Sequence, residues 1–290
     1  MRRFVLVAAS ALAMACASHA PSSTPTPATP PPAPPGAPPP PPAAAQAVRL
    51  GPSALRYLMH QVVHIDQEFQ GTRQPLDFGL RIFFKVTITG PADTIGYPTT
   101  VTIDSIIPDS GTTVPMGINV TAAKGLSFIG RLTPVGKFRE QVASDSVAAQ
   151  ALSPLVGRFK NFFPRLPVAG VTLGASWTDT TTESDRAAGN VTVTSINRSR
   201  ALAWDDRLGA RVLRLEVLSD FTIKGGGEQA GQPFEVAGNG VRAGVDYIAV
   251  DGRYMGGESR DSTNLTISLP IQAMTIPRTQ VSRTTVTVLP

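Results

Sequence analysis

The stretch LDFGLRIFFKVTIT, residues 76–89, alternates apolar and polar side chains with one large exception, Phe83. Successive side chains of a β-strand point to opposite faces of the sheet, so a period of two collects the apolar residues on one face. A helix would scatter the same residues around its circumference. The stretch therefore predicts a long antiparallel strand with one buried and one solvated face. The buried face would carry Leu76, Phe78, Leu80, Ile82, Phe84, Val86 and Ile88.

Similar alternation recurs along the chain between turns rich in glycine, proline and aspartate. The glycine-rich stretches 225–227 and 238–240 are expected to form turns, and Asp205 and Asp206 to lie in a loop. The pattern as a whole predicts a mainly β fold, a long-stranded antiparallel curved sheet that forms a half-barrel or a barrel. Further strands are expected at residues 99–107, in a pair within 125–141, and at 170–182, 191–204, 211–223, 245–250, 265–271 and a last segment ending at Val288.

Residues 55–70 fit two structures. As a strand, the segment places Tyr57, Met59 and Val63 on one face and His60 and His64 on the other. As a helix, it also gives a passable apolar stripe, with a serine at the cap position. The turn-forming residues 71–75 lead directly into the strand at 76–89, which favours the strand.

One segment has the pattern of an amphipathic helix, near residues 153–163. Ser153 and Pro154 suit the cap and the first helical position, because the missing N–H of proline is not needed there. Four apolar residues follow at helical spacing: Leu155, Phe159, Phe162 and Phe163. An earlier start, near Val147, is the alternative, and Pro164 ends the helix. We expect the apolar stripe to lie in the hollow of the curved sheet, as a fixed plug or as part of a site for a hydrophobic ligand.

The N-terminus has the features of an export signal. Arg2 and Arg3 precede an apolar run that is too short to span a membrane, and the run ends in LAMAC, residues 12–16. This ending resembles the lipobox of bacterial lipoprotein signal peptides, although alanine stands at position 13, where that family usually has leucine, valine or isoleucine. The resemblance implies lipidation of Cys16, membrane attachment through the lipid, and a place in the cell envelope, on the outer membrane and facing the periplasm. The alternative is an ordinary secretory signal cut near Ala15 or Ala20.

The chain divides into three parts. Residues 1–15 are the expected signal peptide, and residues 16–46 form a lipidated N-terminus with a tether. Thirteen of the 22 residues at 21–42 are proline, which favours an extended polyproline II chain without a core. At about 3.1 Å per residue this stretch could span on the order of 70 Å. Residues 47–290 are expected to form a single β-rich domain.

Composition and motifs exclude several functions. The formal net charge of +5 is not gathered into basic clusters with interleaved aromatic residues, so we expect no nucleic-acid partner. No catalytic triad motif, phosphate loop or cofactor motif occurs, so no cofactor is expected. His60 and His64, with Asp66 and Glu68 on the same face, are the candidate metal ligands. An ordinary solvated face is the simpler interpretation, because zinc requires three or four converging ligands.

The order of elements, with long hairpins, one amphipathic helix and more long hairpins, resembles the half-barrel LolA-like lipoprotein carriers and other bacterial lipoproteins with this layout. The resemblance covers residues 55–289 and implies no site residues. Three functions remain open. The protein would bind a lipid or other hydrophobic ligand on its curved sheet, present a surface to an envelope protein as a structural or assembly lipoprotein, or be a hydrolase without a recognisable motif.

Overall fold

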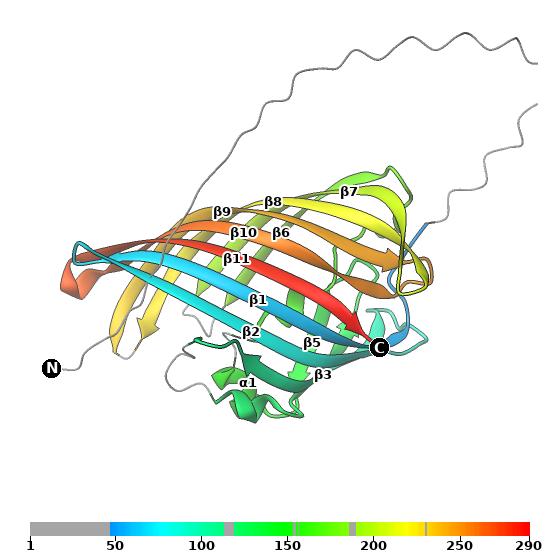
Figure 1. The fold of residues 1–290 in the computed structure, drawn as a ribbon, viewed down its shortest axis with the longest axis horizontal. Helices are drawn as coiled ribbons and strands as arrows, with labels where there is room; N and C mark the ends of the chain where they lie inside the picture. Colours follow the sequence, from blue (N-terminus) through cyan, green and yellow to red (C-terminus); the bar gives the residue numbers. More distant parts are fainter. Residues whose placement is uncertain (1–46, 113–118, 153–154, 156, 186–189, 230) are drawn as a thin grey trace, which may run out of the picture.

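A computed structural model describes residues 47–112, 119–152, 155, 157–185, 190–229 and 231–290. Eleven strands in these ranges form one antiparallel sheet, which curls into an open half-barrel (Figure 1). The mainly β prediction is confirmed. The strands are β1 (Ser53–Phe69), β2 (Thr72–Ile88), β3 (Tyr97–Pro108), β4 (Ser127–Leu132), β5 (Phe138–Ala143), β6 (Ser176–Asp185), β7 (Val191–Arg207), β8 (Ala210–Gln229), β9 (Gln232–Ala249), β10 (Tyr254–Leu269) and β11 (Met274–Leu289).

The strand order is β5-β4-β3-β2-β1-β11-β10-β9-β8-β7-β6. Almost every strand therefore pairs with its neighbour in the sequence, as in hairpins. The exception is β1 with β11, which joins the start of the domain to its end. Strands β5 and β6 follow each other in the chain but lie at opposite edges of the sheet. The segment between them, residues 144–175, therefore connects the two edges of the half-barrel.

The segment that fitted both a strand and a helix is a strand. All seventeen residues of β1 pair with β2, and twelve of them also pair with β11. Tyr57, Met59 and Val63 point to the buried side, and His60 and His64 point away from it. The period-two reading of this segment is confirmed.

The segment expected to be helical, residues 153–163, is described only in part: Leu155 is α-helical, and its neighbours 153, 154 and 156 lie outside the described residues. The α-helix α1 (Ser146–Ala151) precedes this segment and agrees with the alternative start near Val147. The Asp145 side chain caps α1 by accepting hydrogen bonds from the backbone N–H groups of Val147 and Ala148, both at 2.9 Å. Gly157–Asn161 forms the short 3-10 helix η2 instead of a continued α-helix. Two further 3-10 helices are η1 (Val120–Ala123) and η3 (Pro270–Gln272). Ser153 and Pro154, the expected start, lie outside the described residues.

The glycine-rich stretches do not form turns, and this prediction is wrong. Residues 225–227 lie inside β8 and residues 238–240 inside β9, while Asp205 and Asp206 lie near the end of β7. The physical reason is close packing within the sheet. A Cβ at Gly240 would overlap the ring of Phe221, and one at Gly238 would overlap the carbonyl oxygen of Asn264. Glycine is used at these positions because there is no room for a side chain.

Aromatic side chains fill one end of the half-barrel. Phe162 packs edge-to-face on Tyr57, Phe84 and Tyr254, with ring centroids 5.1 to 5.2 Å apart, and Phe159 packs on Phe84 at 4.9 Å. The N-terminal residues of the domain close this end. Val48 bridges to Val171, and a backbone hydrogen bond of 3.1 Å runs from Gly51 to the turn after β9. Among the described residues, no packed aromatic pair of this kind lies near the β1–β2 turn.

Within the described part of the chain, no helix has the length and apolar character needed to cross a membrane.

Candidate functional site

A cavity of about 520 Å³ lies on the concave face of the sheet, the face that also carries Tyr57 and Phe84. Strands β6 to β11 supply most of its wall, and Phe162 and Phe163 bound the side next to the aromatic cluster. The inward side chains reach it because they alternate with outward ones along every strand. The cavity is therefore built from the sheet itself.

One part of the cavity wall is apolar. Val217, Phe221 and Ile223 share the inward face of β8, on which the polar Ser219 lies between the first two, and Leu265 contributes from β10. The strand between them, β9, has glycine at positions 238 and 240, each paired across the sheet with β8 and β10. The side chains of Phe221 and Leu265 lie over these two glycines, which leave no room for a side chain of their own.

The next part of the wall is polar and internally hydrogen-bonded. Ser219 donates to the amide oxygen of Asn197 at 2.6 Å, and Ser282 donates to the Asp261 carboxylate at 2.9 Å. Arg242 lies 3.3 Å from the other carboxylate oxygen of Asp261 and also donates to Ser259 at 3.0 Å. Polar groups in such a network can exchange partners with a ligand. The wall therefore presents both apolar surface and polar groups to whatever enters.

A buried carboxylate lies between the polar wall and the aromatic cluster. The Tyr254 hydroxyl donates to Asp246 at 2.7 Å, and the Tyr57 hydroxyl donates to the backbone oxygen of Tyr254 at 2.8 Å. Burial raises the pKa of the Asp246 carboxyl, and the hydrogen bond from Tyr254 and the charge of Arg242 only partly oppose it. Burial, together with the nearby Asp246, holds the pKa of Tyr254 well above its usual value.

A second charged group lies where η2 meets the edge strand β6. Arg165 donates to Asn161 at 2.8 Å and lies 3.8 Å from Glu183, and Asn161 donates to Glu183 at 2.6 Å. Burial lowers the pKa of Arg165, while Glu183 and Asp179 act in the opposite direction. These contacts hold the segment after η2 against β6 and form one rim of the cavity.

The four apolar residues expected to bind a ligand have two different places. Leu155 and Phe159 are buried in the core and do not line the cavity. Phe162 and Phe163 are also buried, but they contribute to the cavity wall at its aromatic end. The cavity therefore lies directly beside the aromatic cluster.

The two histidines point to the convex face and do not meet. His60 lies 2.6 Å from Asp109, which also pairs with Arg81 at 2.9 Å, and His64 lies 2.6 Å from Asp77. The hydrogen bond from His60 is the main cause that lowers the pKa of Asp109. In the parts of the chain that the structure describes, no three histidine, cysteine or carboxylate side chains lie close enough to hold a metal ion. Cys16 lies outside the described residues.

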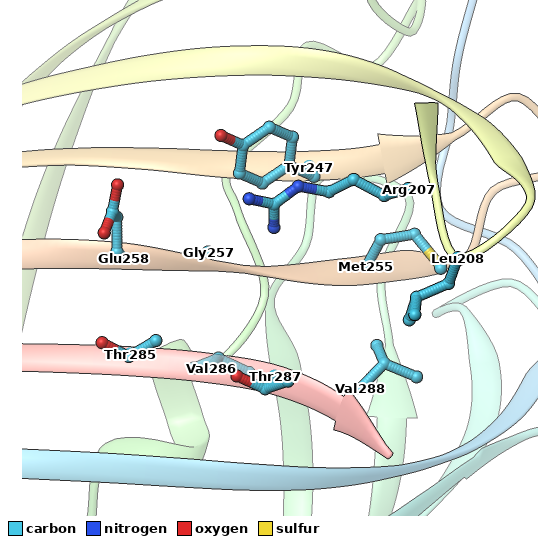
Figure 2. A pocket seen from close by; sticks show the side chains of 10 residues that line it. All are labelled: Arg207, Leu208, Tyr247, Met255, Gly257, Glu258, Thr285, Val286, Thr287 and Val288. Carbon is cyan, nitrogen blue, oxygen red and sulfur yellow. The ribbon is translucent and has the colours of Figure 1, made fainter. Parts of the chain in front are cut away.

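A smaller hollow of about 360 Å³ lies near the turn between β7 and β8 (Figure 2). The Arg207 guanidinium stacks on the Tyr247 ring at 3.5 Å, and Met255 and Leu208 lie beside it (Figure 2). The stacked pair forms part of the wall of this hollow, which is smaller than the concave cavity. We therefore regard the concave cavity as the candidate site.

The polar cavity residues were missed in the sequence. Asp246 and Arg242 occupy inward positions of β9 two and six places before Ile248, a buried residue on the same face. The signal in the sequence was a charged residue at an even spacing from a buried residue of the same strand, because even spacing places both side chains on the same face. It was obscured because the same face of β9 carries glycine at positions 238, 240 and 244 instead of large apolar residues.

Comparison with known proteins gives no assignment: no protein-family model matches the chain, and no curated protein matches its sequence. The fold and the site define the class at a structural level, an open antiparallel half-barrel with an amphipathic cavity on its concave face.

Proposed function

We propose that this protein is an envelope lipoprotein that binds an amphiphilic ligand in the concave cavity. The observation that carries the proposal is the two-part wall, with Phe221, Ile223 and Leu265 on the apolar side and Asn197 and Asp261 on the polar side. A chain of several methylene groups gains about 0.8 kcal/mol for each group buried, so the apolar wall favours an aliphatic tail. Polar groups along the wall would fix the orientation of such a ligand, as a few polar groups do in other pockets.

The layout of the domain supports a binding role over a purely structural one. A sheet that served only as a scaffold would gain stability by filling its concave face throughout, because voids forfeit packing energy. Here the aromatic cluster fills one end, and a cavity of about 520 Å³ remains beside it on the concave face. The resemblance of the layout to LolA-like carriers is consistent with this role.

Filling the cavity tests the proposal. We expect Ser195→Trp, on the cavity face of β7, to lower the affinity for a fluorescent fatty acid at least about tenfold, since the new ring occupies the space of the tail. The control is Ile196→Trp, the next residue along, which is exposed on the opposite face and should bind like the wild type. Fluorescence titration measures both, and native mass spectrometry of protein purified from an envelope fraction detects any retained ligand.

The proposal fails if the wild type takes up neither the fatty acid nor a polarity-sensitive dye. It also fails if both tryptophan variants bind like the wild type. Either result would favour the alternative function, a structural or assembly lipoprotein with a protein-binding surface.

The anchor has its own test. Cells that express the wild-type chain should incorporate a radiolabelled fatty acid into it, and Cys16→Ser should remain unlabelled and be released from membranes. Several acyl chains on one residue give stable attachment where one chain is marginal, so the difference should be nearly complete. Equal labelling of the two proteins would show that Cys16 is not the attachment point.

A further inference from the structure

Three polar residues lie side by side on the concave face, near the β1–β2 turn. Gln67 of β1 pairs across the sheet with Gln74 of β2 on one side and with Arg278 of β11 on the other. Gln67 has only 4% of its surface exposed. The three adjacent strands thus bring two amides and one guanidinium into one row, in which Gln67 is buried and Gln74 and Arg278 are half-buried.

This row has unmet hydrogen-bonding capacity. The Nη2 atom of Arg278 donates to Gln280 at 2.8 Å, while its Nε atom is buried and has no partner among the described residues. Within the same ranges, the Nε2 atom of Gln67 and the Oε1 atom of Gln74 are also buried without partners. Rotation of the two glutamine amides could pair them with each other. That change would still leave the Arg278 Nε–H unmatched.

The charge of Arg278 is unmatched as well. In the described ranges, no carboxylate oxygen lies within 4.0 Å of its guanidinium, whereas Arg242 has Asp261 and Arg165 has Glu183. Burial is the one resolved influence on the pKa of Arg278, and it lowers that pKa. A buried charge without a counter-ion is costly, so its presence at an inward position calls for a negative partner.

The row adjoins the cavity. Gln280, which accepts the hydrogen bond from Arg278, lines the cavity, and so does Leu265, the cross-strand neighbour of Arg278 on β10. A ligand whose tail lies along Leu265 and Phe221 would therefore have one end close to Arg278. Arginine and amide N–H groups together match an oxyanion, since both are donors and one carries a positive charge.

We propose that Arg278 and Gln67 bind the oxyanion headgroup of the amphiphile, a carboxylate or a phosphate. This inference rests on the proposed function and specifies its ligand as anionic. The Nε–H of Arg278 and the amide of Gln67 donate to the headgroup, and the chain extends along the apolar wall. Asp246 and Asp261 face the cavity further from this end and do not take part.

The test compares an anionic probe with a neutral one. We expect the full chain carrying Cys16→Ser, which keeps anchor lipids out of the cavity, to bind dansyl-undecanoate more tightly than its methyl ester. Arg278→Met should reduce the affinity for the acid by about tenfold to a hundredfold and leave the affinity for the ester unchanged. Arg283→Met is the matched control, because Arg283 is exposed on the opposite face of the same strand, and it should bind both probes like the parent.

Competition identifies the headgroup. Dodecyl phosphate and dodecanoate are titrated against bound dansyl-undecanoate, and the stronger competitor distinguishes phosphate from carboxylate. The inference is overturned if the parent binds acid and ester equally, or if Arg278→Met retains the affinity for the acid. If neither probe binds to the parent, the proposed function fails and this inference fails with it.

Stability separates binding from packing. Without ligand, Arg278→Met should melt at the same temperature as the parent or higher, because methionine fills similar space and removes an unmatched charge. A clear fall in melting temperature, with the ester affinity reduced together with the acid affinity, would assign Arg278 a packing role and overturn the inference.

Discussion

Replacing Phe159 by alanine is expected to destabilise the domain by about 3 to 5 kcal/mol, a large part of the stability of an ordinary domain. Phe159 has 1% of its surface exposed and packs against the rings of Phe84 and Phe128, at centroid distances of 4.9 and 6.0 Å. The surrounding side chains are held by the β-sheet, so they cannot collapse into the space that the ring leaves. Urea unfolding followed by circular dichroism measures the loss.

The control for this change is Ile129→Ala on β4. Ile129 is 53% exposed, and its removal should change the free energy of unfolding by no more than about 0.5 kcal/mol. A loss below about 1 kcal/mol for Phe159→Ala would contradict a fixed plug and indicate a segment that moves freely over the sheet. The result therefore separates the two roles that the apolar stripe could have.

Gly256→Ala is expected to cost about 3 kcal/mol or more, from two sources. Gly256 has a φ of +84°, a conformation that costs any L-residue about 1 to 2 kcal/mol. In addition, a Cβ there would overlap the carbonyl oxygen of Val286, a backbone atom that is fixed in the sheet. The pairing of β10 with β9 shifts register between Tyr254 and Gly257, so the glycine stands in an irregularity that positions Tyr254.

Gly71→Ala is the matched control, because Gly71 has a similar φ of +73° but no atom within 4 Å of the added Cβ. Its free energy of unfolding should fall only by the cost of the positive φ, about 1 kcal/mol. The difference between the two variants in chemical denaturation measures the steric term. Equal losses would mean that β10 can shift away from Val286, and that the irregularity does not hold Tyr254 in place.

The sequence predicts the apolar part of the cavity wall but not its charged part. Phe221 and Ile223 follow the period-two pattern of the strand expected at residues 211–223, on the same face as the buried Leu213 and Leu215. Arg242, Asp261 and Arg278 were not recognised, because a charged residue on a strand is assigned by default to the solvated face. Their inward direction follows from the register of the strands. The sequence of one strand does not show which of its faces is buried when glycine stands in place of the apolar residues.

The sequence by itself determined the β-rich class of this protein, the long strands and their buried faces, because alternation is a local property of each segment. Local pattern also indicated the apolar stripe of Leu155, Phe159, Phe162 and Phe163. Only the tertiary structure decided that β1 pairs with β11, that the glycines at 225–227 and 238–240 lie inside strands, and that Gln67 meets Arg278. Each of these depends on contacts between residues far apart in the chain, and the free energy of such contacts is set by the packing of neighbouring strands rather than by local sequence.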